Sequence, residues 1–165
     1  MSSHESTHAR PLARRNAVKA IVLGGGLAGA LDLAFALTYY SVKGGKMVKV
    51  LQSIAAGVQG KAAYQGGVGS AALGVVLHFM IALGAAAVFC AAGRALPVLL
   101  RKPWISGPIF GAGVYYFMNL VVLPLSALQT KGYPLKWEPW MLAAHVVLVG
   151  LPIALMAQRY SASRL

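Results

Sequence analysis

Four polar side chains are embedded in otherwise apolar stretches of this sequence. They are Asp32, His78, Asn119 and His145, and each belongs to a different apolar run. Burying an acid or an imidazole in an apolar helix is costly, so such a residue tends to face neighbouring helices or a cavity. Aspartate and histidine are also the residues typical of proton relays inside membranes. We therefore take these four residues as a candidate intramembrane polar cluster.

The apolar runs that carry these residues are long enough to cross a bilayer. A hydrocarbon core about 30 Å thick needs roughly 20 apolar residues per helix. The mean hydropathy of +0.67 is too high, and the charged fraction of 11% too low, for a soluble domain. The predicted spans cover about residues 20–40, 69–96, 105–123 and 140–157. The predicted fold is all-α, an integral membrane four-helix bundle.

The remainder of the chain is divided around this bundle. Residues 1–16 are predicted to be a flexible N-terminal tail, and residues 17–160 form a single transmembrane domain. Residues 46–64 are predicted to form an additional amphipathic helix, too polar to span, that lies in the interface or against the bundle. Its apolar stripe consists of Met47, Leu51, Ile54, Ala55, Val58 and Ala62, with Gln52 among the residues that lie off the stripe.

Helix geometry places the polar residues at similar depths. With a rise of about 1.5 Å per residue, Asp32 and His78 fall at nearly the same level, and all four polar residues fall in the outer half of the bilayer. Small residues share their faces, which allows other helices to approach closely. The predicted helix-packing glycines are Gly25, Gly29, Gly74, Gly107 and Gly111. The run GGGLAG at 24–29 matches a dinucleotide fingerprint only formally, because no strand or βαβ pattern surrounds it.

Three interpretations of the polar cluster remain open. The residues could pair across helices and fix their packing, or they could form a proton-handling or ligand-binding pocket. His78 and His145 could also hold a haem as axial ligands, although no cofactor and no metal site is otherwise predicted. An enzymatic role is not favoured, because the spans offer no serine with a base and a third orienting group. Cys90 is the single cysteine, which excludes an intrachain disulfide.

The basic residues indicate membrane partners and an orientation. The formal net charge is +12, but the 15 lysines and arginines lie mostly between the apolar runs, where they would meet anionic lipid headgroups and not nucleic acid. Nine of them flank the spans on the side of the two termini and six on the other side, which predicts that both termini are cytoplasmic. The expected partners are the bilayer, anionic lipids and either a second copy or a larger membrane complex.

Three stretches carry a resemblance to a known family. They are LGVVLHFMIALG (73–84), RKPWISGPIFG (101–111) and VYYFMNLVVLPLSAL (114–128). Over about residues 22–128 the chain resembles small four-span proteins of the bacterial inner membrane, the YagU-like family, for which no activity is assigned. The resemblance implies a multi-pass inner-membrane protein and lends no catalytic residue. The alternatives for function are a proton-linked small transporter or channel component, and an accessory or haem-binding subunit of a larger complex.

Overall fold

The computed structural model describes residues 9–128 and 138–161, and every secondary-structure element in these ranges is helical. The first half contains α1 (Ala9–Val42), α2 (Met47–Gln59), a 3₁₀ turn η1 (Gly60–Gln65), α3 (Gly67–Ala95) and α4 (Val98–Arg101). The second half contains α5 (Pro103–Phe117), a π-helical segment η2 (Met118–Val122), α6 (Leu123–Leu125), α7 (Pro139–Ala144), a second π-helical segment η3 (His145–Gly150) and α8 (Leu151–Ser161).

Four helical stretches are long and apolar enough to cross a membrane. They are Asn16–Val42, Gly67–Ala95, Pro103–Leu125 and Pro139–Ser161, and each contains almost all of one predicted span. The last two are each built from several labelled elements, because a π-helical segment interrupts the α-helical hydrogen bonding without ending the helix. The all-α prediction and the prediction of four span-length helices are therefore confirmed.

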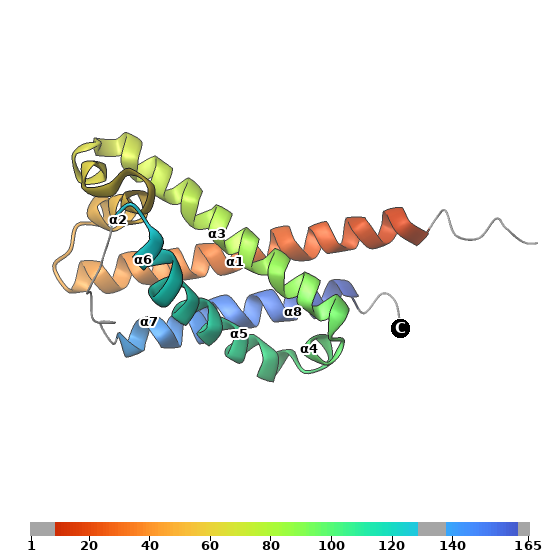
Figure 1. Ribbon diagram of the computed structural model, residues 1–165. Coiled ribbons are helices and arrows are strands. Elements are labelled where there is room, and N and C mark those ends of the chain that lie inside the picture. The colour runs from red at the N-terminus through yellow and green to blue at the C-terminus, as the bar shows by residue number, and fades with distance from the viewer. Residues whose placement is uncertain (1–8, 129–137, 162–165) are drawn as a thin grey trace, which may run out of the picture.

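The four long helices alternate in direction (Figure 1). The start of α1, the turn around α4 and the end of α8 lie at one end of the molecule, whereas α2, α6 and the start of α7 lie at the other. We call these the α4 end and the α2 end. The first helix packs against both α3 and α8, and α5 packs against η3 and α8. The largest apolar cluster consists of Ala28, Ala86, Phe89, Val149, Ile153, Ala154 and Ala157.

The first helix begins earlier than predicted. It is already helical at Ala9, so the second half of the segment predicted as a flexible tail continues the first span, and residues 1–8 lie outside the described ranges. Alanine, leucine and arginine dominate residues 9–15 and have high helix propensity. Pro11 falls in the first turn, where proline is tolerated because that backbone N–H has no partner within the helix.

The face that α2 buries also differs from the predicted one. Gln52 is only 2% exposed and donates from Nε2 to the backbone oxygen of Gly67, 2.9 Å away. Met47 and Val58, predicted on the buried stripe, are 56% and 64% exposed. The cause is the close docking of α2 on α3 at Gly74, which favours the small Ala55 and Ala56 at the contact and rotates the larger side chains outward.

Several predicted packing glycines lie where two helices approach closely. A Cβ at Gly25 would lie 2.9 Å from the Cα of Leu83, and one at Gly29 would lie 2.9 Å from the ring of Phe79. These two positions set the spacing of α1 and α3. Gly107 and Gly111 receive the backbone of the last span, at Gly150 and His145, so α5 is held equally close to η3.

Adjacent glycines in α1 offer a matched test of this packing. Gly25→Ala should destabilise the protein by about 1–3 kcal/mol, because the new methyl group would overlap the α3 backbone. Gly26→Ala should be neutral or stabilising by up to roughly 1 kcal/mol, because nothing lies within 4 Å of its Cβ position. Thermal unfolding in detergent measures both. Equal effects of the two substitutions would contradict the close α1–α3 contact.

Candidate functional site

The structure brings Asp32 together with two histidines from two other helices. Asp32 lies on α1 and is only 8% exposed. Its Oδ1 is 3.5 Å from Nδ1 of His145 in η3, and its Oδ2 is 4.0 Å from Nε2 of His78 in α3. One oxygen of the carboxylate therefore faces each imidazole.

Both imidazoles also contact a backbone carbonyl. Nε2 of His78 is 2.9 Å from the oxygen of Gly29 on α1, and Nδ1 of His145 is 2.9 Å from the oxygen of Met141 in its own helix. A carbonyl oxygen can only accept a hydrogen bond, so the hydrogen bond assigns a proton to each of these nitrogens. The same N–H group of each ring thus lies between a carbonyl and the Asp32 carboxylate.

The carboxylate itself is incompletely satisfied. Oδ1 of Asp32 is buried and makes no hydrogen bond, because the nearest N–H groups are directed to backbone carbonyls. An unpaired polar atom in an apolar interior is costly, and an unpaired charge is more so. A proton shared among the three groups would reduce that cost, either as an imidazolium beside the carboxylate or as a neutral acid.

Local backbone features position His145. It is the first residue of the π-helical segment η3, and such segments occur frequently at functional sites. Gly111 of α5 lies directly against the backbone of His145. The buried ring of Tyr115, one turn further along α5, packs edge-on against the imidazole with centroids 5.4 Å apart. Tyr115 was not predicted as a member of the site, although its position on the face of Asn119 was the available signal.

Asn119 lies apart from this group in its hydrogen bonding. Its Nδ2 donates to the backbone oxygen of Tyr115, 2.8 Å away and one turn earlier in the same stretch of helix. Of the four predicted cluster residues, three are therefore joined by short contacts across helices, and the fourth is bonded to its own helix. We call the buried Asp32 and the two half-buried imidazoles of His78 and His145 the buried triad, after the carboxylate at its centre.

A second group of polar side chains lies at the α2 end of the molecule, where α1 ends and α7 begins. Tyr39 Oη donates to Oε2 of Glu138, 2.6 Å away, and Lys43 Nζ lies 3.3 Å from the same oxygen. Lys43 also donates to Tyr39 Oη, and this hydrogen bond, followed by the effect of Glu138, raises the pKa of Lys43. The contribution of the charged Lys43 to the stability of the fold is therefore complete below the usual lysine pKa. It is lost only as the pH rises through the raised pKa. We call these three residues the end clamp.

The described residues include no group of three His, Cys, Asp or Glu side chains arranged to hold a metal ion. The Asp32 carboxylate faces both imidazoles, so an iron coordinated by His78 and His145 together would have to displace it. Haem ligation by these two histidines stays a prediction.

The fold and the site define a class, an all-α chain with four candidate membrane spans and a buried Asp–His–His group. Comparison of the chain with protein family models, with curated proteins and with solved structures finds no match.

The distances predict unequal coupling within the triad. In double-mutant cycles on thermal stability in detergent, Asp32→Asn should couple more strongly to His145→Gln than to His78→Gln, because its oxygen lies closer to the His145 ring. The larger coupling should be about 1 kcal/mol, as is usual for polar contacts between membrane helices. Asn119→Ala serves as the control and should be additive with Asp32→Asn. Strict additivity in all three cycles would contradict the triad.

Proposed function

We propose that this chain is a multi-pass membrane protein whose buried triad binds and releases a proton within the membrane, as a component of proton-linked transport. The observation that carries the proposal is the buried Asp32 carboxylate, which faces two imidazoles and has one oxygen without a hydrogen bond. Intramembrane acids and histidines in contact are typical of proton relays. The substrate class is therefore the proton, together with a small solute whose movement it drives.

The alternative is that the triad only fixes helix packing. The hydrogen bond from His78 to the Gly29 oxygen does join α3 to α1, as a structural role requires. A structural polar contact, however, is most stable when all its buried polar atoms are paired. The unpaired Oδ1 instead leaves one buried acceptor open, either to a proton or to a reoriented N–H group of His145.

We further propose a location in the bacterial inner membrane with both termini in the cytoplasm, and two features agree with termini on one side. The start of α1 and the end of α8 lie at the same end of the molecule (Figure 1), in agreement with an even number of spans. More basic residues flank the spans at this end than at the other. Four spans are few for a transporter, because larger folds supply two halves that move, so we include a second copy and anionic lipids among the proposed partners.

Proton binding can be measured directly at the two imidazoles. In ring-labelled protein followed by nuclear magnetic resonance, His78 and His145 should take up a proton reversibly in the accessible pH range. Asp32→Asn should change that uptake, because the carboxylate that faces both rings is gone. Asn119→Ala should leave it unchanged. Failure of both rings to titrate, or titration that is insensitive to Asp32→Asn, would favour the purely structural role.

The topology has its own test by cysteine labelling. In a Cys90→Ala background, Ser2→Cys and Gln129→Cys should react with an impermeant maleimide from opposite sides of sealed vesicles. Residues 2 and 129 are separated by three of the four candidate spans, which is an odd number. Reaction of both from the same side would refute the four-span arrangement.

A further inference from the structure

The buried triad has different surroundings on its two sides along α1. One turn before Asp32, Ala28 is fully buried in the large apolar cluster of α1, α3, η3 and α8. One turn after it, Ala36 is 9% exposed, and the next turn carries Tyr39 and Tyr40. Both alanines are thus buried, but the side of Ala28 adjoins the large apolar cluster, whereas two turns beyond Asp32 on the side of Ala36 lie the polar groups of Tyr39, Lys43 and Glu138.

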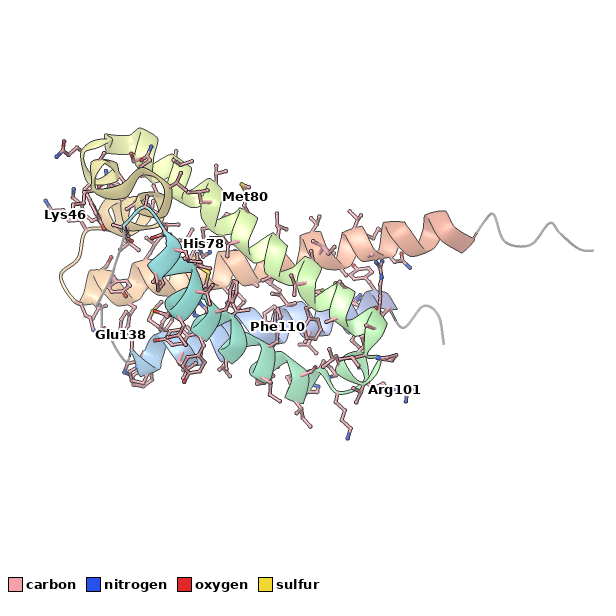
Figure 2. The ribbon with its side chains drawn as sticks, viewed as in Figure 1. Lys46, His78, Met80, Arg101, Phe110 and Glu138 are labelled. Carbon is pink, nitrogen blue, oxygen red and sulfur yellow. The ribbon has the colours of Figure 1, made fainter. Side chains whose placement is uncertain are left out.

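The end clamp and the triad lie on the same seam between two helices. Tyr39 follows Asp32 by seven residues, and Glu138 precedes His145 by seven. Seven residues are nearly two turns, so Tyr39 shares a face of α1 with Asp32 and lies about 10 Å further along the axis. Glu138 is the N-cap residue of α7 and precedes His145 by a similar length of chain. Asp32–His145 is thus the buried contact of this helix pair, and Tyr39–Glu138 is its contact at the exposed end. Figure 2 shows Glu138 at the end of the molecule opposite Arg101.

We propose that, in the conformation seen here, the buried triad exchanges protons toward the α2 end and not toward the α4 end, along the seam between α1 and α7, and that the end clamp restricts this route. The inference rests on the proposed function and adds a direction of access to it. Proton movement requires polar groups or water in sequence, and the apolar cluster toward the α4 end supplies neither. Toward the α2 end, the route is bordered by phenol, ammonium and carboxylate groups.

The charged and titratable groups that face the route come from each helix around it. His78 from α3 and His145 from η3 face Asp32, whereas Tyr39 and Lys43 from α1 face Glu138. Tyr115 from α5 packs on His145. Neutralising Glu138 removes the anion that pairs with Lys43 and accepts a hydrogen bond from Tyr39. This loss should loosen the end clamp. Glu138 is accordingly a positioning residue that controls access to the triad.

Two alanines placed symmetrically around Asp32 provide the test. In a Cys90→Ala background, Ala36→Cys and Ala28→Cys should differ in their reaction with a hydrophilic methanethiosulfonate reagent, which requires water at the thiol. Ala36→Cys should react about tenfold faster, which corresponds to about 1.4 kcal/mol in the free energy of local opening. Adding Glu138→Gln should raise the rate at Ala36→Cys several-fold and leave Ala28→Cys unchanged. Equal rates at the two positions, or a faster rate at Ala28→Cys, would overturn the one-sided route.

A second measurement requires no introduced cysteine. Exchange of the ring C2 hydrogen of histidine for deuterium, followed by mass spectrometry, reports how readily solvent reaches each imidazole. Exchange at His145 should be faster in Glu138→Gln than in the unaltered protein, and unchanged in Arg94→Gln at the α4 end. An unchanged rate in Glu138→Gln would overturn the role of the clamp. If the triad titrates as proposed but these access measurements fail, only the one-sided route is wrong.

Discussion

The free-energy cost of burying the Asp32 carboxylate is the constraint on which the rest of this structure depends. An acid within an apolar helix bundle is tolerated only when partners lower the cost of its charge or hold it neutral. The two imidazoles come from different helices, so α1, α3 and the last span must meet at one level around a single carboxylate. Helix packing and the chemistry of the site are therefore determined by the same contacts.

Small residues make these contacts attainable. Gly25 and Gly29 let α3 approach α1 until Nε2 of His78 reaches the backbone oxygen of Gly29. Gly111 receives the backbone of His145 in the same way, and the π-helical segment that begins there changes the path of the last span. The glycines thus act on the site through the distances between backbones, since a methyl group at any of these positions would separate the polar partners.

The two ends of the bundle differ in a way that bears on function. Toward the α4 end, the triad adjoins a closely packed apolar cluster of alanines, Phe89, Val149 and Ile153. The α2 end carries the clamp formed by Tyr39, Lys43 and Glu138, whose hydrogen bonds can be remade with solvent. In the proposed function, this difference would direct proton exchange at Asp32 toward the α2 end.

The sequence by itself determined the all-α class and the four span-length helices, because the length of an apolar run is a local property that the thickness of a bilayer converts directly into a helix. Counting residues along straight helices was also enough to place Asp32 and His78 at similar depths, and the structure brings them within 4.0 Å. The spacing of the glycines indicated that another helix could approach closely, but not which helix would do so.

Only the tertiary structure decided which polar atoms meet. Counting placed only Asp32 and His78 at the same level, yet His145 lies closer to Asp32 than His78 does, because helix packing sets the relative shift of the first and last spans. Asn119 satisfies itself within its own helix, and Gln52 is buried because α2 docks on α3 in a rotation that hydrophobic periodicity did not specify. The equal spacing of Tyr39 from Asp32 and of Glu138 from His145 was present in the sequence. It acquired meaning only once those two helices were neighbours, since contacts between distant segments depend on packing that local patterns do not encode.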